Sequence, residues 1–313
     1  MTVGIILNNE HSGVAIADSR ITSNNQRQSD SANKLTTIVE NSYEGAILGA
    51  GDASMIFSLL KHAKRARNET LEGFLADIKN TWFNIIEETR LQIIEFQSKV
   101  SRNETDAMGE GMPLQFNPEN DITPPPEPFD MSECMTIFYD RKEQRIKKHR
   151  IFPEAYMEDH IFESVIGSGS DAAGLEFLRL MPGTSIKSLG HREIAFFGMC
   201  AYVKATQNIG VGGMPKIALI DKMGVTKISK EAAVSMANII GAYTSELITR
   251  DYAELHFGEV MTGLVDYANI EKHIGLPKFA LENLLVPLES WIGYANRKRY
   301  RKNPYPAPPE KGI

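Results

Sequence analysis

The spacing of apolar and polar residues changes several times along the first hundred positions. Four short apolar runs come first, each bounded by turn-forming residues, at 3–7, 13–17, 34–40 and 45–51. Runs of this length and flanking composition predict short, buried strands. From Ala53 the apolar residues recur at helical spacing, as at Leu71, Phe74, Leu75 and Ile78. This part of the pattern predicts two helices, over 53–69 and 70–100.

A proline-rich stretch then interrupts the regular pattern. Residues 101–130 include NPENDITPPPEPFD and predict a long surface insertion. After it, the pattern predicts strands at 134–140, at 146–152 and in ESVIGSGS (163–170), helices at 171–181 and 191–209, and a hairpin over 216–229. Residues 230–297 have a helical pattern and precede a basic run, RKRYRK, and a second proline-rich stretch.

The order of these elements is strands, two helices, strands, two helices, strands. This order fits neither the strict βαβ alternation of a parallel sheet nor an all-β protein. It predicts an α/β protein with a four-layer αββα sandwich, in which two antiparallel sheets face each other and helices cover both outer faces. We expect this domain to span 1–229, and residues 230–313 to form a C-terminal helical extension with a basic, proline-rich tail.

Composition and charge narrow the classes of function. The 313 residues are 42% hydrophobic and 24% charged with a net charge of −6, which favours a globular protein and gives no general attraction to nucleic acid or anionic membranes. No secretory signal and no membrane-spanning run is evident. Cys134 and Cys200 are isolated, which suits a reducing cytoplasm. The histidine spacing and the lack of a P-loop lead us to expect no metal and no cofactor.

The start of the chain carries the candidate chemistry. A hairpin turn centred on Glu10 would place Thr2 opposite Asp18, and a loop centred near Gln26 would return Lys34 to Asp18. A threonine hydroxyl needs a base beside it, and a free α-amine with a pKa of about 7.7–8.0 can serve once Met1 is removed. Lys34, held by Asp18, would lower the proton affinity of the nucleophile. The spacing therefore predicts an N-terminal threonine nucleophile.

These residues, taken with IADSR (16–20), NKL (33–35), LGAGDAS (48–54) and GSGSDAAGLEFL (167–178), resemble the N-terminal-nucleophile hydrolases of the proteasome β-subunit type. The resemblance covers about residues 2–229. It implies the αββα fold, self-association into rings or spirals, and cleavage of peptide bonds in peptides or unfolded proteins. An ATP-dependent unfoldase is a further partner that it implies.

The resemblance also implies roles for residues around Thr2. It makes Thr2 both nucleophile and base, and Arg20 a supporting charge behind the pair of Asp18 and Lys34. It assigns the N–H group that stabilises the oxyanion to Ala50–Gly51, without choosing between them. Ser168 resembles the serine that hydrogen-bonds the terminal amine.

Two positions depart from the family pattern. Asn208 and Val211 stand where active members carry an aspartate and a serine before a Gly-Gly pair, here Gly212-Gly213. These departures motivate the hypothesis of a non-catalytic, proteasome-like assembly protein. It stands beside two others, a threonine-type peptidase and a peptide ligase that uses the same acyl-enzyme.

Overall fold

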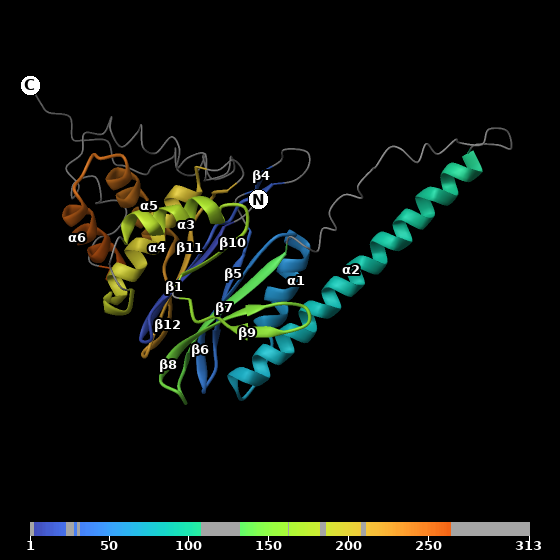
Figure 1. The fold of residues 1–313 in the computed structure, drawn as a ribbon, viewed down its shortest axis with the longest axis horizontal. Coiled ribbons are helices and arrows are strands. Elements are labelled where there is room, and N and C mark those ends of the chain that lie inside the picture. The colour runs from blue at the N-terminus through green and yellow to red at the C-terminus, as the bar shows by residue number, and fades with distance from the viewer. Residues whose placement is uncertain are drawn as a thin grey trace, which may run out of the picture.

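The structure is a computed structural model that describes residues 3–22, 28–29, 32–107, 132–161, 163–181, 186–207 and 211–263. Within these residues two five-stranded antiparallel sheets lie face to face, with helices outside both (Figure 1). The predicted four-layer αββα sandwich is therefore confirmed.

The first sheet has the order β10-β1-β2-β11-β12. Its strands are β1 (Gly4–Asn8), β2 (Ser12–Ala17), β10 (Glu163–Ile166), β11 (Lys216–Asp221) and β12 (Gly224–Lys227). Every residue of β1 and β2 is buried, because this sheet is covered on both faces. Along β1, Ile5 and Leu7 pack toward the helices while Ile6 packs toward the other sheet, as the two-residue period of a strand requires.

The second sheet has the order β5-β6-β7-β8-β9. Its strands are β5 (Leu35–Val39), β6 (Tyr43–Ala50), β7 (Glu133–Asp140), β8 (Arg145–Ile151) and β9 (Tyr156–Glu158). A separate two-stranded ribbon, β3 (Ile21–Thr22) and β4 (Gln28–Ser29), lies within the polar segment that follows β2. An apolar layer that includes Ile6, Ala15 and Ile137 fills the space between the two large sheets.

The helices form the two outer layers. Helices α1 (Ala53–Ala63) and α2 (Leu71–Ala107) cover the second sheet through a core that includes Phe74, Trp82 and Phe138. Helices α3 (Ser170–Leu180), α4 (His191–Ala205), α5 (Lys230–Thr244) and α6 (Arg250–Met261), with the short 3-10 helix η1 (Ile186–Ser188), lie on the side of the first sheet. None of the described helices is long and apolar enough to cross a membrane.

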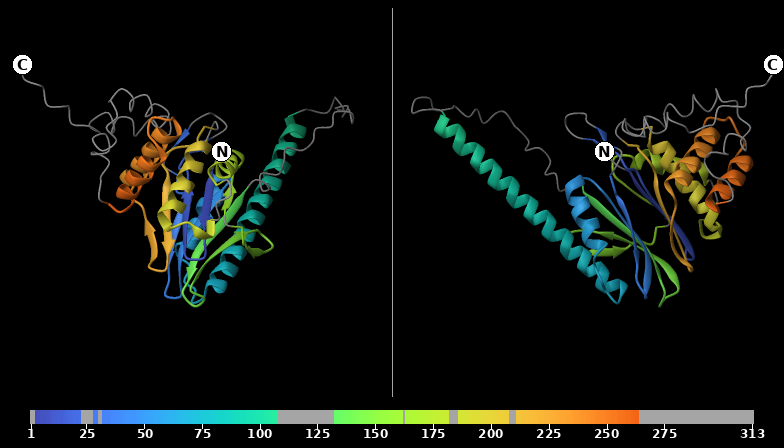
Figure 2. Two further views of the ribbon diagram at one scale, coloured as in Figure 1. Left: turned by 60° about the vertical axis from the view of Figure 1, so that its left-hand side comes forward. Right: turned by 180° about the vertical axis from the view of Figure 1, so that it is seen from behind.

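Helix α2 differs most from the prediction. The expected insertion began at residue 101, but the helix continues to Ala107, so its first seven residues are helical. The proline-rich remainder of the insertion lies outside the described residues. The far half of α2 extends well beyond the sandwich in every view (Figures 1 and 2). Strand β9 and the β3–β4 ribbon are too short for a periodic pattern and were not predicted.

Candidate functional site

The register between β1 and β2 sets the geometry at the start of the chain. Gly4 pairs with Ala17 and Ile5 with Ile16, so the hairpin places Val3, and not Thr2, opposite Asp18. The amide of Asp18 donates to the carbonyl of Val3 at 3.2 Å, which continues this register. The predicted pairing of Thr2 with Asp18 is thus wrong by one residue, because the turn is centred between Glu10 and His11. Thr2 itself lies outside the described residues.

Asp18 is a fully buried carboxylate at the end of β2. Its Oδ1 accepts hydrogen bonds from the Lys34 ammonium at 3.0 Å and from the Val3 amide at 3.1 Å. Its Oδ2 accepts from the amides of Arg20 at 3.3 Å and Gly212 at 3.4 Å. Burial raises the pKa of the Asp18 carboxyl, while the Lys34 ammonium and the amides of Val3 and Gly212 act against that rise.

Lys34 is the buried cation of this pair. It precedes β5 and is only 4% exposed, and besides Asp18 it donates to the backbone carbonyl of Arg20. Its own carbonyl accepts from the amide of Gly49 at 3.1 Å, which fixes it to the end of β6. The contact between Lys34 and Asp18 that the spacing predicted is therefore present. The same Asp18 oxygen, Oδ1, also binds the amide of Val3, the residue after Thr2.

The segment before β11 closes the site from the other side. Gly212 donates to Asp18, and its carbonyl accepts from the Arg20 amide at 3.1 Å. Ser19, which the sequence did not single out, accepts from the Met214 amide at 2.7 Å through its Oγ. Gly212 and Gly213 have φ values of 147° and 83°, in the region that favours glycine. The Gly-Gly pair therefore allows the backbone turn that brings Gly212 into contact with Asp18 and Arg20.

The two departures from the family pattern precede this turn in the sequence. Val211 is 1% exposed and packs in the core beneath the helices, so it contributes apolar packing at a position where a serine would offer a hydroxyl group. Asn208 lies outside the described residues.

Ser168 lies in the turn between β10 and α3. Gly4 pairs with Ile166 in an antiparallel ladder, so the chain just before Gly4 and the chain just after Ile166 lie at the same end of the sheet. The turn also packs directly on β1, because a Cβ added at Gly169 would lie 3.0 Å from the Cβ of Val3. The backbone thus brings Ser168 to the end of the sheet where Asp18 lies.

Gly51 follows β6 directly and precedes the N-cap of α1. Its φ of 122° favours glycine, and Asp52 caps the helix by accepting from the amides of Ser54 and Met55 at 2.9 and 3.0 Å. The N-terminus of a helix carries partial positive charge. The predicted oxyanion segment, Ala50–Gly51, therefore lies where β6 passes into a capped helix N-terminus.

Arg20 contributes to the site through its backbone in each of the contacts described above. Its amide bonds Asp18 and Gly212, and its carbonyl accepts from Lys34. The residue is 6% exposed. These contacts are made by the backbone of Arg20, and the supporting charge predicted for its side chain stays a prediction.

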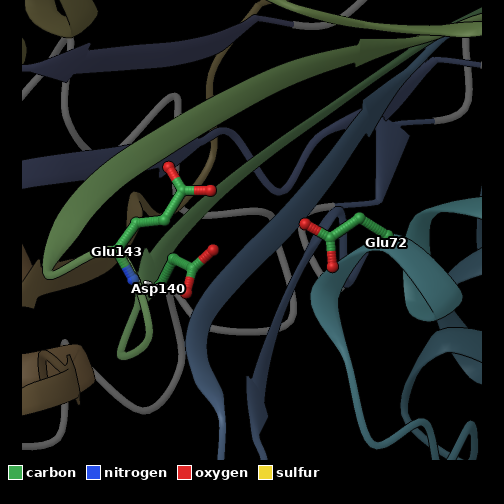
Figure 3. A group of neighbouring side chains, drawn as sticks. All are labelled: Glu72, Asp140 and Glu143. Atoms are coloured by element: carbon green, nitrogen blue, oxygen red, sulfur yellow. Dashed lines mark hydrogen bonds between the residues drawn. The ribbon is translucent and has the colours of Figure 1, made fainter.

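One cluster of three carboxylates has the spacing of a metal site among the described residues. Glu72, Asp140 and Glu143 point toward one another from α2, the end of β7 and the turn that follows it (Figure 3). The buried Lys147 already contacts them, with its Nζ 2.8 Å from Asp140, 2.6 Å from Glu143 and 3.7 Å from Glu72. Burial would lower the pKa of Lys147, but hydrogen bonds to Asp140 and Glu143 raise it overall. One ammonium group therefore offsets part of the negative charge of this cluster.

A hollow of about 450 Å³ lies at the opposite end of the sandwich. The β1–β2 turn contributes His11 and Ser12 to its lining, and His191 and Asp221 face each other in it at 3.2 Å. None of the predicted site residues lines it. It is therefore separate from the end of the sheet that holds Asp18 and Lys34.

The two sheets and their outer helices place the chain in the structural class of four-layer αββα sandwiches. The sequence matches no protein-family model and no curated protein. Solved structures with this fold include a Gly-1 mutant of Anbu from Hyphomicrobium sp. strain MC1, at 14% identity and a TM-score of 0.53, covering 79% of this chain and 95% of that chain.

Two further solved structures have a similar fold. Anbu from the same Hyphomicrobium strain is 12% identical with a TM-score of 0.51, covering 78% of this chain and 94% of that chain. Anbu (ancestral beta-subunit) from Yersinia bercovieri is 10% identical with a TM-score of 0.52, covering 84% of this chain and 95% of that chain. At these identities the likeness establishes the fold.

Proposed function

We propose that this protein is a threonine-type amidohydrolase of the proteasome superfamily, in which Thr2 becomes the N-terminal nucleophile after removal of Met1. The observation that carries the proposal is the shared oxygen of Asp18. It accepts hydrogen bonds from both the Lys34 ammonium and the Val3 amide, so Asp18 links a buried cation to the residue that follows Thr2. The Anbu-like fold is consistent with this assignment.

The proposed reaction begins with attack by Thr2 Oγ on the carbonyl carbon of a peptide bond. The Thr2 α-amine accepts the hydroxyl proton, and a backbone N–H of the Ala50–Gly51 segment stabilises the oxyanion. The amine then gives its proton to the leaving nitrogen, which breaks the C–N bond and leaves an ester on Thr2. Water hydrolyses the ester, with the same amine as its base.

The surroundings of Lys34 explain what it would contribute. A positive charge near the hydroxyl favours its deprotonated form, and the contact with Asp18 keeps the ammonium in place without exposing it to water. Ser168, at the same end of the sheet, would hydrogen-bond the terminal amine. Arg20 would hold the pair through its backbone.

The direct test combines mass spectrometry with turnover of fluorogenic peptides. We expect intact mass to show a species without Met1, and a peptide vinyl sulfone to label Thr2 Oγ. Thr2→Ala should abolish both turnover and labelling while the fold is retained. Thr226→Ala, the same change at an exposed position on β12, is the matched control and should leave both unchanged. Turnover by Thr2→Ala equal to that of the wild type would refute the proposal.

Two rivals make different predictions in the same experiments. A non-catalytic assembly protein is favoured by the buried Val211 and predicts retained Met1 and no labelling. A ligase would label in the same way but would join added peptides through new amide bonds, which mass spectrometry detects.

Self-association belongs to the same proposal, because proteasome-type peptidases enclose their sites in an assembly. Light scattering of the full chain should show a homo-oligomer, and a monomer would argue against this part. An ATP-dependent unfoldase is the proposed partner for folded substrates. Addition of a candidate unfoldase with ATP should then increase degradation of a folded test protein.

A further inference from the structure

The two backbone loops of the candidate site come from different sheets. Gly51 follows β6 in the second sheet, and Ser168 follows β10 in the first. Both loops contain a glycine with positive φ, 122° at Gly51 and 85° at Gly167. Glycine backbones have more conformational freedom than other residues, so the relative position of these loops needs a restraint from elsewhere.

Two consecutive residues, Ser132 just before β7 and Glu133 at its start, each bind one of these loops through a side chain. Ser132 Oγ accepts a hydrogen bond at 3.1 Å from the amide of Asp52, the residue after Gly51. Glu133 Oε2 accepts a hydrogen bond at 3.0 Å from the amide of Gly167, the residue before Ser168. Glu133 also ends the β6–β7 ladder, where it pairs with Ala50.

Together these contacts connect the two sheets at one end of the sandwich. The backbone of Glu133 is fixed to the oxyanion segment through the ladder, and its side chain crosses to the turn that carries Ser168. Ser132 restrains the other side of the oxyanion segment, at the N-cap of α1. We propose that Ser132 and Glu133 are positioning residues that hold the Ala50–Gly51 segment and the Ser168 turn at a fixed separation.

This inference rests on the proposed function for its catalytic consequence. Neither side chain needs to touch the substrate. The oxyanion donor and the partner of the terminal amine must both be placed correctly at the same reacting carbonyl, and a small displacement of one loop relative to the other reduces the rate far more than substrate affinity.

Kinetics of matched variants test the catalytic part. Glu133→Ala and Ser132→Ala should each lower kcat for a fluorogenic peptide by about tenfold with KM changed by less than about twofold. Glu133→Gln and Ser132→Thr keep an acceptor oxygen and should recover most of kcat. Glu10→Ala, at the exposed β1–β2 turn, is the control and should match the wild type. A purely structural role would lower the melting temperature in proportion and would not split kcat from KM.

Hydrogen exchange tests the geometry without requiring activity. Glu133→Ala should speed exchange of the Gly167 amide by about tenfold and leave the Asp52 amide unchanged, whereas Ser132→Ala should do the reverse, since each amide loses its acceptor. Unchanged exchange at both amides would overturn the inference, and so would unchanged kcat in both alanine variants. Failure of the proposed function is distinguishable, because it appears as a wild-type protein without Thr2-dependent turnover.

Discussion

Replacing Lys34 with methionine would leave a buried carboxylate without its cation. Asp18 is fully buried and, among the described residues, would keep the amide donors of Val3, Arg20 and Gly212. At the 3.0 Å separation of the pair and an effective dielectric constant of about 20, the attraction that is lost amounts to about 5–6 kcal/mol before desolvation is counted. Removing one partner of a buried pair costs about 3–5 kcal/mol in measured cases.

Thermal unfolding of a matched set of variants measures this cost. For domains of this size class 1 kcal/mol corresponds to about 2–4 °C, so we expect Lys34→Met to lower the melting temperature by about 6–20 °C. The double variant Asp18→Asn with Lys34→Met should be less destabilised than the sum of the two single variants by at least about 1 kcal/mol, because no unpaired charge remains. Lys227→Met, at an exposed position on β12, should stay within about 0.5 kcal/mol of the wild type.

The result that would refute this reasoning is equally specific. If Lys34→Met unfolds within about 1 kcal/mol of the wild type, the pair does not hold the start of β1. Strict additivity in the double variant would show that Asp18 and Lys34 are not coupled.

Three further predictions concern stability. His149 is buried, and burial lowers its pKa from 6.5 to about 4. As the pH falls below 6.5, the unfolded chain binds a proton at this histidine before the folded protein does, so the free energy of unfolding should drop by about 3 kcal/mol between pH 6.5 and 4. His149→Gln should flatten this part of the pH profile, and an unchanged slope in the variant would contradict the prediction. Gly45→Ala would place a Cβ 2.0 Å from the Ile137 carbonyl oxygen and should cost at least about 2 kcal/mol, whereas Gly174→Ala, with open space in α3, should not destabilise; equal melting temperatures for the two variants would be evidence against this. Lys147→Met should expose the repulsion of its three carboxylate neighbours, so that added Ca²⁺ raises the melting temperature of the variant and not of the wild type; a rise in both would count against it.

Much of the fold follows from local pattern. Most strands and helices were predicted to within a few residues, although α1 ends at Ala63 rather than at residue 69 and α2 at Ala107 rather than at residue 100. Their order alone indicated the sandwich. The hairpin register was wrong by one residue, because a polar turn such as NNEHSG can be centred on a residue or between two. The end of α2 was missed because its last turns are polar and read like the start of the insertion.

Register arithmetic could predict the candidate site only where chain spacing is short, whereas Ser168 and the Ala50–Gly51 segment entered through the family resemblance. Asp18 and Lys34 are 16 residues apart and connected by one loop, so register arithmetic brings them together. Ser132 and Glu133 contact residues 80 and 34 positions away and follow a proline-rich stretch without periodicity. No local pattern of apolar and polar residues predicts contacts between residues so far apart in the chain. Ser19 was missed for the same reason, because its partner Met214 is 195 residues distant.

The burial of Val3 has a practical consequence for the laboratory. Its side chain has no exposed surface and its amide is bound to Asp18, so the chain is fixed in the core from the residue directly after Thr2. Under the proposed mechanism, an affinity tag at that end would lie where the substrate binds and would convert the amine that serves as the base into an amide. Recombinant preparations should therefore carry their tags at the other terminus, and specific activity should scale with how completely the expression host trims the initiator methionine.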